Sequence, residues 1–112
     1  MKSYTSIEQS KKLAEILPTE SADMVYVSTG YSARALPKED EDAQAYPSIV
    51  PCWSLAALLG VLPIPSLHKT CYGWRCDSYL KDGACCLFGE NTDNPIDACV
   101  AAIGKLHEQK LL

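Results

Sequence analysis

Residues 51–63 read PCWSLAALLGVLP and lie in the longest run of the chain without a charged residue. The leucines fall at positions 55, 58, 59 and 62, which is the spacing of a helix with one buried stripe. The pattern predicts a helix over about residues 52–61. It begins either with Ser54 as its cap or with Pro51 in its first turn. We expect this helix to form the centre of the core.

Two further helices are predicted on either side of it. The sequence TSIE at residues 5–8 has the pattern of a capping box, a hydroxyl cap followed three residues later by Glu. A helix over about residues 6–17 follows and ends at Pro18. The sequence NPID at residues 94–97 places a capping Asn, a first-turn Pro and an acidic residue at a helix start. This start predicts a helix over about residues 95–109.

The segment between the first two helices contains a strand and an acidic stretch. The β-branched and aromatic sequence MVYVS at residues 24–28 predicts a strand, and Thr29-Gly30 turns it into a weaker strand over residues 31–36. The sequence EDED at residues 39–42 lacks the ligand spacing of a calcium loop. Because its like charges repel one another and apolar residues are few, we expect an exposed acidic loop over residues 38–47.

A hairpin is predicted ahead of the last helix. Asp82-Gly83 is a strong turn signal, with an alternating strand over residues 67–80 before it and a return strand over residues 84–89 after it. A two-residue loop pairs Tyr79 with Cys86 and Arg75 with Glu90, whereas a three-residue loop shifts the register by one and turns Cys86 and Phe88 inward. In the first register the core face carries Tyr72, Trp74, Cys76, Ser78, Leu80, Cys85 and Leu87.

Together these elements predict a single α+β domain over residues 1–112. Three helices pack on one face of an antiparallel sheet in two layers, in the order helix, strand or hairpin, helix, hairpin, helix. A chain of 112 residues is long enough to bury such a core.

Composition narrows the classes of partner. The net charge is −4 and only two residues are arginines. Binding to nucleic acid needs clustered basic residues, so no nucleic-acid partner is expected. No apolar run is long enough for a membrane span, so no membrane partner is expected. The N-terminus lacks the apolar core of a signal peptide, which predicts a cytoplasmic protein with its six cysteines reduced.

The cysteines and histidines suggest two chemistries. Structural zinc sites usually contain C-x-x-C, which does not occur in this sequence. A nucleophilic thiol needs a lowered pKa, and Cys52 at a predicted helix start is the best placed. No phosphate-binding glycine motif occurs. We therefore assign no catalytic, cofactor-binding or metal-binding residue and expect no cofactor, while a small Cys/His-dependent metal-binding protein or thiol enzyme is the alternative function.

The outer face of the predicted hairpin is the candidate site. It carries Arg75, Asp77, Tyr79 and Phe88, and the chain has more aromatic residues than one small core face can hold. Exposed aromatic residues beside an arginine are typical of a protein-binding surface. The alternative is that a second layer of the chain, or a dimer mate, covers them. If they are exposed, the partner is another protein or a second copy of the chain.

Several segments together resemble a known set of proteins. These are PCWSLAALL at residues 51–59, Leu62-Pro63, Glu90, NPIDACV at residues 94–100 and KLH at residues 105–107. They are similar to small uncharacterised proteins of Bacteroides-type gut bacteria, often associated with prophages and other mobile elements. The set has no assigned activity, so no functional residue is carried over. The resemblance implies a cytosolic accessory protein of mobile-element origin, which agrees with a non-enzymatic protein-binding role.

Overall fold

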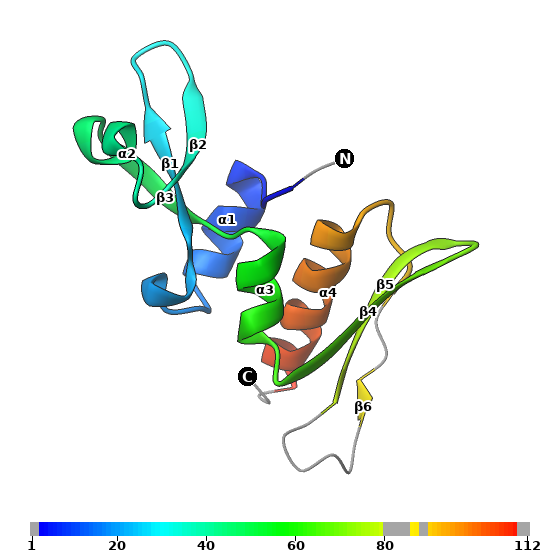
Figure 1. Ribbon diagram of the computed structural model, residues 1–112. Coiled ribbons are helices and arrows are strands. Elements are labelled where there is room, and N and C mark those ends of the chain that lie inside the picture. Colours follow the sequence, from blue (N-terminus) through cyan, green and yellow to red (C-terminus); the bar gives the residue numbers. More distant parts are fainter. Residues whose placement is uncertain (1–2, 80–85, 88–89, 110–112) are drawn as a thin grey trace. The chain divides into compact units, whose positions relative to one another are not determined.

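The computed structural model describes residues 3–79, 86–87 and 90–109 (Figure 1). The chain divides into two compact units, one formed by Tyr4–Ala57 and the other mainly by Leu58–Leu112. Each unit has its own antiparallel sheet, with strand order β2-β1-β3 in the first and β4-β5-β6 in the second. The α+β class is confirmed, but the prediction of three helices on one sheet is wrong, because the described residues form two sheets and four α-helices.

The first unit begins with a helix whose cap differs from the prediction. Its elements are α1 (Ile7–Ala14), the 3₁₀ turn η1 (Thr19–Ser21), β1 (Met24–Ser28), β2 (Ala33–Pro37), α2 (Glu41–Ala45) and β3 (Ser48–Cys52). The capping box of α1 pairs Ser6 with Gln9, one residue later than expected. The Ser6 hydroxyl accepts from the Gln9 backbone N–H at 3.2 Å, and the Gln9 side chain accepts from the Ser6 N–H at 3.1 Å.

Thr5 is buried and connects three elements by hydrogen bonds instead of capping α1. Its hydroxyl lies 2.8 Å from the Ser10 hydroxyl and accepts from the Trp53 backbone N–H at 3.1 Å. Its carbonyl accepts from the Tyr26 hydroxyl at 2.7 Å, and its own N–H donates to the Trp53 carbonyl at 3.0 Å. This network ties α1, β1 and the end of β3 together. It also satisfies polar groups that would be costly to bury without partners.

The hairpin of β1 and β2 is confirmed, and a short helix lies in the acidic segment. Met24 pairs with Pro37 at one end of the hairpin and Ser28 with Ala33 at the other. Within residues 38–47, where a loop was expected, α2 forms because the Asp40 carboxylate accepts from the Asp42 N–H at 2.9 Å. Most of this segment is exposed, but Ala43 is buried against the sheet.

Prolines explain why two strands escaped the sequence analysis. Pro51 lies inside β3, although it had been considered for the first turn of the central helix, and Pro65 lies inside β4. β3 and β4 are edge strands, and an edge strand tolerates proline because one row of its N–H groups needs no partner in the sheet. β1 lies between β2 and β3 in one sheet, and β5 lies between β4 and β6 in the other. The described strands therefore form two sheets where one was predicted.

The central helix is shorter than predicted, and the division between the two units falls within it. α3 spans Leu55–Val61, and the Ser54 hydroxyl accepts from the Ala57 N–H at 3.2 Å, which settles Ser54 as the cap. Leu58 and Leu62 are buried as the stripe requires, whereas Ala56 and Gly60 are exposed. The helix is followed by β4 (Ile64–Thr70), β5 (Gly73–Tyr79), β6 (Cys86–Leu87) and α4 (Pro95–Glu108).

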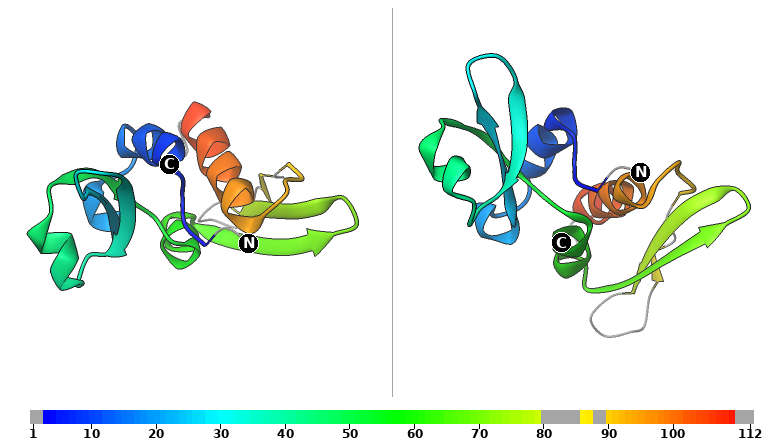
Figure 2. Two further views of the ribbon diagram at one scale, coloured as in Figure 1. Left: turned by 90° about the horizontal axis from the view of Figure 1, so that it is seen from above. Right: turned by 45° about the horizontal axis from the view of Figure 1, so that its top comes forward.

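α4 packs along the hairpin of β4 and β5 (Figure 2). As predicted, Asn94 caps this helix, accepting from the Asp97 N–H at 2.9 Å, with Pro95 in the first turn. Its buried residues are Pro95, Ile96, Ala98, Cys99, Ala102, Ile103 and Leu106. Just before the helix, the backbones of Thr92 and Trp74 exchange two hydrogen bonds of 2.7 and 2.8 Å. These bonds anchor the start of α4 to β5.

The two-residue register predicted for the second hairpin is confirmed where the structure describes it. Ser78 pairs with Leu87 and Tyr79 with Cys86. The turn at Asp82-Gly83 and the side chain of Phe88 lie outside the described residues. Farther along, the bridge between Trp74 and Thr92 shifts the pairing by one residue, so the sheet does not place Arg75 opposite Glu90.

We predict that Gly73→Ala destabilises the second unit. Gly73 has a φ of 126°, and a Cβ there would overlap the Thr92 carbonyl oxygen. Backbone strain and overlap together cost about 3 kcal/mol or more of unfolding free energy. Urea unfolding followed by circular dichroism measures the loss. Gly104→Ala is the control, since its Cβ meets nothing within 4 Å and a helical alanine stabilises by up to about 1 kcal/mol. Equal stability of the two variants would contradict this role of Gly73.

We also predict that the first unit loses stability in alkali through Tyr26. Burial, with smaller contributions from Cys52 and Tyr4, raises the pKa of Tyr26 from 10.0 to about 12. The folded state therefore holds a proton that the unfolded state has released. The unfolding free energy should fall as pH rises from about 10 to about 12, by up to about 3 kcal/mol.

Urea unfolding over this pH range tests the effect with two variants. Tyr26→Phe should show a shallower decline than the wild type, because it has no proton to lose. Tyr31→Phe is the control, since Tyr31 is fully exposed, and it should keep the wild-type slope. Parallel slopes for Tyr26→Phe and the wild type would rule out the contribution of Tyr26.

Candidate functional site

The strand register places the candidate residues on one face of the β4–β5 hairpin. Ile64 lies opposite Tyr79, Ser66 opposite Asp77, and His68 opposite Arg75. Since side chains alternate along a strand, all six share one face. We call it the Arg75 face, defined by Ile64, Ser66, His68, Arg75, Asp77 and Tyr79. Cys76 and Ser78 point to the opposite face, where α4 packs, and both are fully buried.

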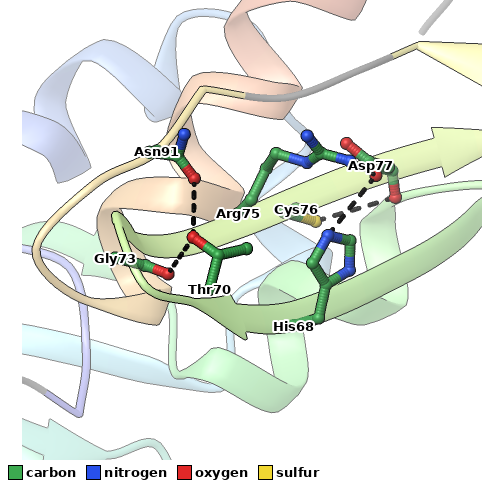
Figure 3. A network of polar contacts seen from close by, with 7 residues as sticks. All are labelled: His68, Thr70, Gly73, Arg75, Cys76, Asp77 and Asn91. Atoms are coloured by element: carbon green, nitrogen blue, oxygen red, sulfur yellow. Dashed lines mark hydrogen bonds and ion pairs between the residues drawn. The ribbon is translucent and has the colours of Figure 1, made fainter.

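A buried carboxylate organises the centre of the Arg75 face (Figure 3). Asp77 is almost fully buried, and the Arg75 guanidinium donates to its carboxylate at 3.0 Å. His68 on the neighbouring strand points toward the same carboxylate oxygen, with its Nε2 at 3.7 Å. A carboxylate is costly to bury without such partners. Asp77 thereby holds the Arg75 side chain in place on the strand.

The apolar part of this face lies at one end of the hairpin. Ile64 and Tyr79 form a cross-strand pair, and they are 45% and 43% exposed. Arg75 is also accessible, with a third of its side chain exposed. An aliphatic side chain, an aromatic side chain and an arginine therefore reach solvent together. This is the chemistry of a contact surface, because tyrosine and arginine are enriched among residues that dominate protein binding.

A second set of polar contacts fixes the other end of the hairpin (Figure 3). The Thr70 hydroxyl lies 3.1 Å from the Gly73 carbonyl and 3.2 Å from the Asn91 side-chain oxygen. It also accepts from the Tyr72 N–H at 3.1 Å. These bonds close the two-residue turn at Cys71 and Tyr72 and hold β4 and β5 in register.

Three of the four residues predicted for the site lie together. Arg75, Asp77 and Tyr79 share the Arg75 face, whereas Phe88 lies outside the described residues. Ile64 and His68 were not expected on this face because residues 67–80 were predicted to form one strand, whereas they belong to β4 and β5. Gly73, three residues after Thr70, was the signal for the turn, since its positive φ suits glycine.

The thiol chemistry considered for Cys52 does not fit its surroundings. Cys52 ends β3 and is fully buried, so it does not stand at a helix start. Burial is the main cause that raises the pKa of its thiol, although hydrogen bonds from Thr5 and Ser10 act in the opposite direction. Cys52 therefore does not meet the requirement of a lowered pKa.

Within residues 3–79, 86–87 and 90–109, His, Cys, Asp and Glu form no group of three or more that could hold a metal ion. Over the same part of the chain, none of the helices has the length and apolar character needed to cross a bilayer.

Comparison of the chain with protein-family models, with curated proteins and with solved structures gives no match in any of the three. The Arg75 face is thus the feature on which a functional hypothesis for this α+β protein rests.

We predict that Arg75 and Asp77 are energetically coupled. Asp77→Asn should lower the unfolding free energy by about 1–3 kcal/mol, since it weakens the interactions of a buried group. A cycle with Arg75→Met should give a coupling of about 1 kcal/mol, because Arg75 is partly exposed. Urea unfolding of the single and double variants provides the values.

The exposed ion pair between Lys105 and Glu90 provides the control cycle. These groups lie 3.5 Å apart and Glu90 is 67% exposed, so Lys105→Met and Glu90→Gln should couple by no more than about 0.5 kcal/mol. If the two cycles gave the same coupling, Asp77 would not be the organising group of the Arg75 face.

Proposed function

We propose that this chain is a non-enzymatic accessory protein that binds another protein through the Arg75 face. The observation that carries the proposal is the exposure of Ile64 and Tyr79 side by side on a paired hairpin. A binding role requires that the chain's own residues leave part of this face accessible, which holds for Ile64 and Tyr79. Exposed apolar side chains that lie together with an arginine favour a protein partner.

Preorganisation of Arg75 supports the same role. Its guanidinium is held by Asp77 at 3.0 Å, and Asp77 itself is anchored in a paired strand. A partner therefore meets an arginine whose side chain has already lost much of its rotamer freedom. Binding then costs less conformational entropy than it would with a flexible arginine.

The partner is another protein, with a second copy of this chain as one form of it. The resemblance to accessory proteins of prophages and mobile elements agrees with a role that acts through a partner instead of through catalysis. The alternative of a Cys/His-dependent metal protein or thiol enzyme has less support. Burial raises the pKa of Cys52, the thiol best placed by the sequence.

Site-specific photocrosslinking tests the proposal. A benzophenone amino acid in place of Tyr79 should crosslink to one discrete protein in cells that naturally produce the chain. The control position is Tyr72, which is 81% exposed in the turn of the same hairpin but lies outside the Arg75 face. Position 72 should not give that product. Combining the position-79 probe with Arg75→Ala should greatly reduce its yield.

The mass of the product identifies the partner. A product of twice the chain's mass, formed also by the purified protein, shows that the partner is a second copy. A product of another mass identifies a different protein, which mass spectrometry then names. Equal crosslinking from positions 72 and 79, or no product at position 79, would overturn the proposal.

A further inference from the structure

The first unit has an edge strand whose outer backbone groups are open. β2 lies at one edge of the sheet β2-β1-β3, and no other described strand pairs with its far side. The Thr29 N–H donates to the Ser32 carbonyl at 3.0 Å, so these two residues face each other across the β1–β2 hairpin. Because backbone groups alternate along a strand, Ala33 and Ala35 turn their N–H and C=O groups away from β1. These groups are the ones that a further strand would bond.

The edge strand β4 of the second sheet is interrupted in its outward row. The Trp74 backbone bonds to Thr92 on the side of β5 away from β4, and Ser78, an even number of residues further on, is turned the same way. Pro65 lies opposite Ser78, so it belongs to the outward row of β4. Because proline has no N–H, a strand added to β4 would lose a hydrogen bond there.

β3, the other edge of the first sheet, is interrupted by the same means. Pro51 lies opposite Val25, whose backbone is turned toward β2, so Pro51 belongs to the outward row of β3. The register also shifts at Ile49, which makes the row irregular. In β2 the proline is Pro37, the last residue of the strand, and the residues before it keep their N–H groups. Since prolines and bulges hinder pairing at sheet edges, β2 is better able to pair than β3 or β4.

The charges around β2 favour a second copy of this chain as the added strand. Arg34 is exposed on β2, and the acidic segment 39–42 follows the strand almost directly. Ala43 of α2 packs against Leu36, on the sheet face that also carries Arg34. When two β2 strands pair antiparallel, the start of each lies beside the end of the other. Arg34 of each copy then lies close to the acidic segment of the other, so opposite charges meet twice.

We propose that two copies of this chain form a dimer by antiparallel pairing of their β2 strands, with Ala35 of one copy opposite Ala35 of the other. In this register the two Ala35 residues exchange two backbone hydrogen bonds, and each Ala33 N–H donates to the Pro37 carbonyl across the interface. Every outward N–H of β2 then has a partner. The register that places Arg34 opposite Arg34 is unfavourable, because like charges would lie directly across from each other.

This interface is separate from the Arg75 face. It belongs to the first unit, whereas the Arg75 face is formed by β4 and β5 of the second unit. The dimer therefore does not depend on the proposed binding of a partner protein through the Arg75 face, and each proposal can fail without the other.

Sedimentation velocity and amide hydrogen exchange of the wild-type full chain test the proposal together. Sedimentation over a range of protein concentrations should show a monomer in equilibrium with a dimer. Exchange measured by NMR should slow at the Ala33 and Ala35 amides as the dimer forms. The Arg34 and Leu36 amides should be protected at every concentration, because they bond to β1. A monomer at all concentrations, or a dimer without added protection at Ala33 and Ala35, would refute the β2 interface.

Two charge variants test the electrostatic part of the interface. Arg34→Glu should raise the dissociation constant of the dimer roughly tenfold, because it turns two attractive contacts into repulsive ones. Lys12→Glu is the matched control, since it makes the same change of charge at an exposed position of α1 and should leave the dissociation constant unchanged. Equal effects of the two variants would show that only net charge matters and would exclude the proposed contact of Arg34.

Two further variants locate the association on the molecule. Ala35→Pro removes an outward N–H, which does not bond to β1, and should leave the chain monomeric. Circular dichroism checks that this variant folds, and Arg34→Glu decides the matter if it does not. Arg75→Ala should dimerise as the wild type does. Loss of the dimer in Arg75→Ala would assign the association to the Arg75 face and would rule out pairing through β2.

Discussion

The alternation of side chains along β5 is the constraint on which the second unit depends. One row of β5 meets α4 and is buried, with Cys76 and Ser78 at its centre. The other row presents Arg75, Asp77 and Tyr79 beside the residues of β4. A shift of one residue in the pairing would exchange the two rows and place the carboxylate of Asp77 in the apolar core. The same register therefore decides which residues form the proposed binding face and which are buried against α4.

The first unit relies on a different device, a buried polar network around Thr5. Thr5 forms hydrogen bonds with the backbone of Trp53, the hydroxyl of Tyr26 and the hydroxyl of Ser10, so these hydrogen bonds link several elements. Networks of this kind favour one arrangement, because any other leaves buried groups without partners. The burial of Thr5 also explains why the helix cap moves to Ser6, since the Thr5 hydroxyl is used elsewhere.

Local signals predicted the local elements well. The strand at Met24–Ser28, the capped helix at Pro95–Glu108 and the pairing of Tyr79 with Cys86 all agree with expectation. β3 and the start of β4 were not predicted, because a proline in an edge strand looks the same in the sequence as a proline that ends a helix. Strand alternation placed Arg75, Asp77 and Tyr79 on one face, whereas Ile64 and His68 were not expected there because the turn before Gly73 was not recognised.

The sequence by itself determined the class of the fold, the positions of the main helices, and the alternation that puts Arg75, Asp77 and Tyr79 on one face. These follow from interactions within a few residues, such as caps, turn signals and periodic apolar positions. Only the tertiary structure decided that the described strands form two sheets. It also showed that Asp77 is buried against Arg75 and His68. Such contacts join residues far apart in the chain, and their energies depend on which surfaces pack together.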